Sequence, residues 1–131
     1  MKTLFTNAKL IDPEAQTEDT GWLLVQNGAI AATGQGEPPQ ADETIDCNGL
    51  CLAPGIVDIG VKVGEPGERH KESYASAARA AAAGGVTTMA IRPDTSPAID
   101  TPEALEFVKR RANEDSAVNV LPLAALTKGR E

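Results

Sequence analysis

The sequence is poor in aromatic residues, cysteine and histidine. Aromatic residues make up 3% of the 131 positions, and His70 is the only histidine. The two cysteines, Cys47 and Cys51, are too few for the disulfide scaffold of a small secreted protein. They could form half of a metal site, but no second Cys/His pair is present to complete four ligands. Two small side chains near a strand end are the simpler interpretation.

Long apolar runs and clusters of basic residues are also absent. No apolar run approaches the roughly 18 residues of a membrane span, and polar residues interrupt the N-terminus too early for a signal-peptide core. The formal net charge is −7, whereas a grip on nucleic-acid phosphates needs clustered Lys and Arg. We therefore expect a cytoplasmic protein that binds neither nucleic acid nor membranes.

The length limits the architecture. A closed (β/α)8 barrel needs at least roughly 200 residues, so 131 residues can hold only part of one. Hydrophobic residues reach 41%, which is enough for a core built mainly from Ala, Val, Leu and Ile. The chain changes character at Pro54-Gly55, and we predict two parts, residues 1–54 and 55–131.

Residues 1–54 are predicted to be a β-sandwich segment. Asn27-Gly28 is a strong hairpin signal, and Asn48-Gly49 is predicted to join the last two strands as a pair. The expected strands span residues 4–11, 22–26, 29–34, 44–47 and 50–53.

Residues 55–131 alternate strand and helix. Strands are predicted over 56–63, 86–91 and 118–123, a helix over 68–83, and a second helix start at 100–103, where a capping side chain precedes Pro102. This β-α-β-α-β order predicts parallel strands with right-handed crossovers. The fold class is α/β, a sandwich segment followed by the first units of a TIM barrel that is incomplete in this chain.

The first strand of the second part has two contrasting faces, because side chains alternate along a strand. One face is β-branched and is expected to pack on helices: Val57, Ile59, Val61 and Val63. The other is polar or lacks side chains: Asp58, Gly60, Lys62 and Gly64. This second face fits a strand that opens into a cavity. An edge strand with a salt bridge between Asp58 and Lys62 fits equally well.

Several ordered motifs resemble the opening third of a dihydroorotase, a family of the amidohydrolase superfamily. They occupy residues 54–58, 65–67, 71–73, 80–88, 93–95 and 125–129. The resemblance implies a longer barrel enzyme flanked by a β-sandwich built from both chain ends. It also implies hydrolysis of a cyclic amide in pyrimidine biosynthesis with one or two zinc ions.

The positions that the resemblance assigns to metal have changed. Active members carry Asp-x-His-x-His on the first barrel strand, and here Asp58, Gly60 and Lys62 stand in those places. Glycine offers no ligand atom, and a lysine ammonium has three donors and no lone pair for zinc. We therefore expect no metal and no other cofactor. His70 lies beyond the motif and is predicted to be a surface residue.

The substrate positions that the resemblance implies have changed as well. Gly64 replaces an arginine that would clasp a substrate carboxylate. The family's Met-Pro-Asn-Thr is Arg92-Pro93-Asp94-Thr95 here, and Asp94 would repel an anionic substrate unless Arg92 or Lys62 neutralises it. Four altered positions in one pocket predict lost catalysis rather than changed specificity.

Three hypotheses follow. The first is a catalytically defective dihydroorotase homologue with a structural or assembly role, for which the resemblance implies the catalytic chain of aspartate transcarbamoylase as partner. The second is an active zinc-dependent cyclic amidohydrolase with ligands from later strands. The third is a small stand-alone α/β binding module. Open sheet edges predict a homo-oligomer or completion by another chain.

Overall fold

The computed structural model describes residues 1–130. The chain forms two compact units, Met1–Pro54 and Gly55–Glu131, and each is described by itself. Within residues 1–130, no helix combines the length and the apolar character needed to cross a membrane.

The first unit is a five-stranded sheet in the order β3-β2-β1-β4, with β5 also paired to β1. β1 pairs antiparallel with β2, and β2 with β3. Asn27 and Gly28 adopt positive φ angles of 54° and 78°, which is the turn geometry that joins β2 to β3. The strands span Lys2–Asp12 (β1), Thr17–Gln26 (β2), Ala29–Gly34 (β3), Glu43–Asp46 (β4) and Cys51–Leu52 (β5).

The last two strands of this unit do not pair with each other, so that prediction is wrong. β4 and β5 both run parallel to β1, one after the other along it. The turn between them is held by β1 itself, because the backbone N–H of Cys47 donates to the Thr6 carbonyl at 2.8 Å and that of Gly49 to the Asn7 carbonyl at 2.7 Å. After this turn the chain continues in the same direction, so that β5 runs parallel to β1 as β4 does.

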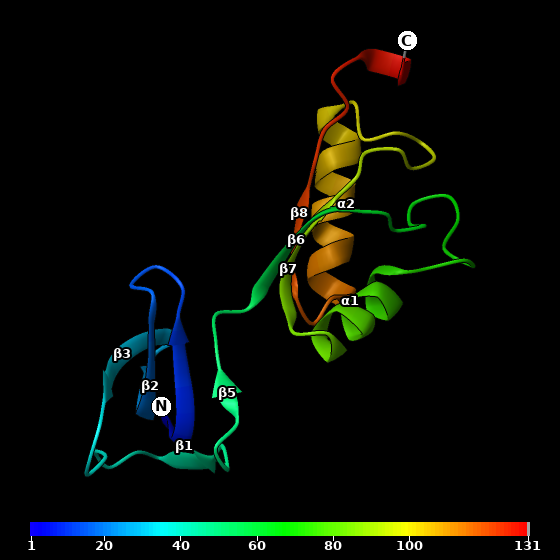
Figure 1. Ribbon diagram of the computed structural model, residues 1–131. Coiled ribbons are helices and arrows are strands. Elements are labelled where there is room, and N and C mark those ends of the chain that lie inside the picture. Colours follow the sequence, from blue (N-terminus) through cyan, green and yellow to red (C-terminus); the bar gives the residue numbers. More distant parts are fainter. Residues whose placement is uncertain (131) are drawn as a thin grey trace. The chain divides into compact units, whose positions relative to one another are not determined.

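The second unit has the predicted β-α-β-α-β order. Its strands are parallel and lie in the order β6-β7-β8, with both helices on one side of the sheet (Figure 1). The elements are β6 (Ile56–Val61), α1 (Tyr74–Ala83), β7 (Val86–Ile91), α2 (Pro102–Asp115), β8 (Asn119–Pro122) and a short 3-10 turn, η1 (Lys128–Arg130).

The helix starts follow their capping residues. α2 begins at Pro102, as predicted, because the Thr101 side chain accepts from the Ala104 N–H at 3.2 Å. α1 begins six residues later than predicted, after Ser73, whose hydroxyl oxygen accepts from the Ser76 N–H at 3.2 Å. The preceding residues, from Glu68, form turns instead of a helix.

The core of this unit lies between the sheet and the two helices. Small residues on α1 let the helix approach the sheet closely, and each fully buried Val, Ile or Met side chain contributes about 1.5–3 kcal/mol. The buried cluster comprises Val63, Tyr74, Ala77, Ala78, Met89, Ile91, Ile99, Val108 and Ala112.

A bulge at Gly60 breaks the predicted alternation along β6. Gly60 has a φ of +92°, and the pairing register with β7 shifts between Ile59 and Val61. Val61 and Val63 pack with the helix-side core. Val57 and Ile59 are instead 57% and 76% exposed, so the prediction that all four residues pack on helices is wrong for these two.

The sheet face away from the helices is therefore open and apolar in this unit. Val57 is level with Thr88, and Ile59 with Ala90, on the same face of the sheet. In the part of the chain that the structure describes, β6 and β8 each pair on one side only. The exposed large apolar residues of β6 and β8 and of the segment after β8 are Ile56, Val57, Ile59, Leu121, Leu123 and Leu126.

Candidate functional site

A pocket of about 220 Å³ lies where β6 and β7 end. The carboxyl ends of parallel strands meet at one edge of a sheet, which is where α/β proteins usually place their sites. Of the predicted site residues, Lys62, Gly64 and Asp94 line it, and Arg92 reaches it through Asp94. The lining comprises Lys62, Val63, Gly64, Pro66, Glu68, Asp94, Thr95 and Ser96.

Asp94 is held by two cations. Its Oδ2 lies 3.3 Å from Lys62 Nζ and 3.1 Å from an Arg92 guanidinium nitrogen. Lys62 is therefore paired across strands with Asp94, and the alternative pairing with Asp58 is wrong. Asp58 is exposed in the middle of β6, level with Met89, and is not part of the cluster.

The charges of the cluster shift the acidity of Asp94. Burial alone would raise the pKa of this carboxyl group, but the hydrogen bond from Lys62 and the positive charges of Arg92 and Lys62 outweigh it, and the pKa lies below its ordinary value. The carboxylate is thus neutralised from both sides, and the three groups together carry one net positive charge.

A second carboxylate in the lining, Glu68, is also paired. It accepts a hydrogen bond from the Lys71 ammonium, which lowers the pKa of Glu68 through that bond and through the charge of Lys71. His70 is exposed in the same turn, as predicted, away from any cluster of ligand groups.

Backbone has closed over Gly64. A β-carbon at this position would lie 2.5 Å from the Glu68 carbonyl oxygen and 2.8 Å from that of Glu72. The Glu68 N–H also donates to the Gly64 carbonyl at 2.5 Å. The turn that begins at Glu68 therefore occupies the space into which a side chain at position 64 would project.

The residues at the implied zinc positions do not fit a metal. Gly60 contributes no donor atom, and the Lys62 ammonium donates to Asp94 and has no lone pair to offer. Within residues 1–130, no three His, Cys, Asp or Glu side chains lie close enough together to hold a metal ion. The chemistry of this donor set favours an ion-pair cluster.

A buried polar network beside the pocket escaped sequence reasoning. The Glu65 side chain is only 6% exposed, and its Oε1 lies 3.2 Å from Arg111 Nε. The Tyr74 hydroxyl donates to the Glu65 carbonyl at 2.8 Å, and the Tyr74 N–H donates to the Glu65 carboxylate at 3.4 Å. Arg111 also pairs with Glu114 and Asp115, so α2 is tied to the segment after β6.

Burial is the main reason that the pKa of Tyr74 is raised well above its ordinary value, and the negative charge of Glu65 adds to it. The hydroxyl is thus a stable donor at neutral pH. Only the Glu-Pro-Gly motif pointed to this region, and nothing in the sequence linked it to Arg111, which lies 46 positions from Glu65.

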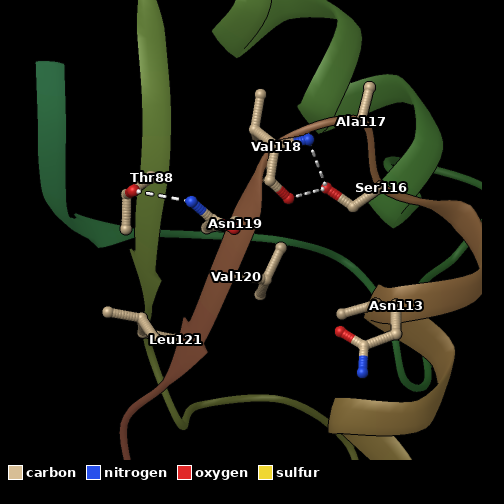
Figure 2. Close-up of a pocket in the computed structure, with 9 residues that line it drawn as sticks. Thr88, Asn113, Ser116, Ala117, Val118, Asn119, Val120 and Leu121 are labelled. Carbon is tan, nitrogen blue, oxygen red and sulfur yellow. Dashed lines mark hydrogen bonds between the residues drawn. The ribbon is translucent and has the colours of Figure 1, made fainter. Parts of the chain in front are cut away.

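A second hollow, of about 490 Å³, lies beside β8 and the end of α2. Several of its polar groups bond to one another: the Ser116 hydroxyl donates to the Val118 carbonyl and accepts from the Val118 N–H, and Asn119 donates to Thr88 (Figure 2). None of the residues that line it is charged. The pocket with Lys62 and Asp94 is therefore the better candidate site.

Comparison with known proteins places this architecture in a family. The family described as dihydro-orotase-like matches residues 49–131, which include the whole second unit. The chain belongs to the dihydro-orotase-like family. It is 43% identical over 135 aligned positions to a dihydroorotase of Wolbachia sp. subsp. Brugia malayi (strain TRS), covering 99% of this chain and 30% of the relative.

Solved structures agree with the fold. An L-hydantoinase (dihydropyrimidinase) from Arthrobacter aurescens superposes with a TM-score of 0.87 at 26% identity, over 98% of this chain and 28% of that one. A dihydroorotase structure superposes with a TM-score of 0.63 at 18% identity, over 94% and 31%, which is a likeness of fold. The predicted fold, a sandwich segment followed by the first units of an amidohydrolase barrel, is confirmed. The chain spans about 30% of the length of the curated relatives it matches.

Proposed function

We propose that this dihydro-orotase-like chain serves pyrimidine biosynthesis as a structural protein without metal-dependent catalysis. The observation that carries the proposal is the pairing of Lys62 with Asp94 where the resemblance implies a zinc ligand. Gly60 offers no donor, and backbone occupies the side-chain space of Gly64. The chemistry needed to polarise a cyclic amide is thus missing from this third of the barrel.

Metal content and turnover test this proposal. Full-length protein, purified without chelators and then dialysed against micromolar zinc, is expected to contain well under one zinc per chain and to hydrolyse dihydroorotate no faster than buffer. The protein named dihydroorotase from Wolbachia is the positive control in the same assay. Stoichiometric zinc together with turnover at ordinary enzyme rates of roughly 1–1000 s⁻¹ would refute the proposal.

The proposed partner is the catalytic chain of aspartate transcarbamoylase. In the part of the chain that the structure describes, the apolar sheet face and the outer edges of β6 and β8 are where further strands would pair. In a full-length protein the rest of a barrel would supply those strands, so the partner rests on the resemblance alone. The alternative to this partner is self-association, or completion of the sheet by another chain. Sedimentation of the full-length protein with and without the transcarbamoylase from the same organism distinguishes them: a joint boundary supports the partnership, and unchanged separate boundaries contradict it.

An active zinc-dependent cyclic amidohydrolase is the second candidate, favoured by the 43% identity to a protein named dihydroorotase. It requires metal ligands from strands that follow β8. The zinc measurement separates the two candidates directly, because an active enzyme must bind metal even if Gly60 and Lys62 contribute nothing.

A further inference from the structure

The Asp94 cluster lies between two backbone links that join the chain after β6 to the chain after β7. On one side, the Arg92 N–H donates to the Val61 carbonyl at 2.9 Å. On the other side, the Ser96 N–H donates to the Pro66 carbonyl at 3.2 Å. Between these links the two segments leave the sheet, and the side chains of Lys62 and Asp94 bridge them.

The geometry concentrates both cations on one oxygen. Lys62 Nζ and the Arg92 guanidinium both contact Oδ2 of Asp94. Because both cations contact the same oxygen, the Asp94 carboxylate offsets the repulsion between them. Asp94 is 26% exposed, compared with 60% for Lys62 and 52% for Arg92, so the carboxylate is the partly buried centre of the cluster.

We propose that Lys62, Asp94 and Arg92 form an ionic staple that fixes the loop after β7 to the end of β6 and excludes divalent cations from the pocket. The three residues serve as positioning residues for residues 93–99. A divalent cation entering here would meet two positive groups and no free carboxylate. The staple concerns the same pocket as the proposed function, but it does not depend on any assembly partner.

The Arg92–Asp94 pair and the bulge at Gly60 would both remain after Lys62 is replaced, and they predict that histidines alone will not rebuild a metal site. Gly60 has a φ of +92°, a conformation that L-residues adopt only with strain. A histidine there would need the bulge to rearrange, although its Cβ would meet no other atom within 4 Å. Arg92 would still place its charge on Asp94. The first obstacle is the backbone conformation at Gly60 and the second is the charge of Arg92, and replacing the side chains at positions 60 and 62 removes neither.

Hydrogen exchange of the full-length protein tests the staple locally. In Lys62→Met, the amides of Ser96 and Ile99 are expected to exchange about threefold to fivefold faster than in the wild type, as loss of exposed ion pairs predicts. The amide of Ala90, inside β7, is expected to be unchanged. Lys62→Arg is expected to restore slow exchange. Lys109→Met, which removes an exposed pair with Glu106, is the matched control and is expected to leave Ser96 and Ile99 unaffected.

Asp94→Asn is the control for any change in exchange that the methionine side chain itself causes, apart from loss of the ion pair. If the staple is real, the double variant Lys62→Met/Asp94→Asn exchanges no faster than Asp94→Asn alone, because Asp94→Asn already removes the contact with Lys62 together with the contact with Arg92. Additive effects, or unchanged exchange in Lys62→Met, would overturn the proposal.

The metal arm uses the double variant Gly60→His/Lys62→His and zinc ions alone, with competition against a chromogenic chelator. We expect no stoichiometric zinc at micromolar concentration. Tight stoichiometric binding in a folded variant would refute exclusion by the pocket. Failure of the staple leaves wild-type zinc content at zero, whereas failure of the proposed function puts zinc in the wild type, so the two failures are distinguishable.

Discussion

Two ion clusters flank the segment after β6, and they differ chiefly in burial. Around Glu65, the carboxylate is 6% exposed and its partner Arg111 is 21% exposed. Around Asp94, the two cations are more than half exposed. Water weakens the second cluster far more than the first. The comparison indicates that Glu65 stabilises the fold of the second unit, whereas Asp94 mainly sets the charge and shape of the pocket.

The largest effect is expected for the buried cluster. Glu65→Ala removes the most buried of the acceptors of Arg111 and the carboxylate contact of Tyr74, and we expect it to lower the free energy of unfolding by about 3 kcal/mol, typical of a broken buried pair. Glu106→Ala removes an exposed pair with Lys109 and is the control, with an expected loss of about 0.5 kcal/mol. Urea unfolding measures both, and equal losses would erase the distinction between the clusters.

The two glycines of the site separate crowding from backbone strain. Gly64→Ala places a β-carbon against two backbone carbonyls and is expected to cost about 2 kcal/mol. Gly60→Ala meets open space but a positive φ, and about 1 kcal/mol is expected. Urea unfolding under matched conditions gives the two values. A smaller loss for Gly64→Ala than for Gly60→Ala would contradict the close packing of the turn over position 64.

The Tyr74 hydroxyl sharpens the comparison at alkaline pH. Tyr74→Phe removes one buried hydrogen bond to the Glu65 carbonyl, and a loss of about 1 kcal/mol is expected. Because the pKa of Tyr74 is raised in the folded state from its ordinary 10.0, its contribution is present below pH 10 and declines above it. Unfolding measured at pH 7 and near pH 11 should show the wild type losing its advantage over Tyr74→Phe. If the difference in the free energy of unfolding between the wild type and Tyr74→Phe is the same at both pH values, the hydroxyl is exposed to water and the buried hydrogen bond is contradicted.

The smallest effect is expected for the exposed cluster at acid pH. The pKa of Asp94 is lowered in the folded state from its ordinary 3.8. Its contribution is therefore present above that value and is lost as the pH falls through the folded-state pKa. Asp94→Asn is expected to be less stable than the wild type by the order of 0.5 kcal/mol at neutral pH, and the difference is expected to shrink as the pH falls below 3.8. Thermal unfolding across this range checks it; a gap that widens in acid would reverse the sign and contradict the pairing.

Local signals in the sequence predicted much of this fold. The β-branched run that ends at Ile91, directly after Gly84-Gly85, predicted β7 with its observed bounds, and Thr101-Pro102 predicted the start of α2. The helix start at Tyr74 was missed because the Ser73 cap lies inside a segment whose composition also suits a helix. The bulge at Gly60 had a signal, since glycine within a strand pattern often marks one.

The contacts of the site were harder to predict. The pairing of Asp94 with Lys62 and Arg92 was anticipated only as one way to neutralise Asp94, because opposite charges at neighbouring strand ends can meet or point apart. The contact of Glu65 with Arg111 joins residues 46 positions apart, and no local pattern encodes it. The collision that a β-carbon would cause at Gly64 depends on the path of a turn, which the spacing of residues does not reveal.

The closure over Gly64 limits which residues can occupy this position. Because two backbone carbonyl groups lie where a side chain at this position would project, a single mutation that introduces a larger residue meets backbone instead of an empty cavity. Such a mutation lowers stability before it can restore any contact with a ligand. The arrangement of the turn therefore favours glycine at position 64 on grounds of folding alone, whatever the position once contributed to a ligand.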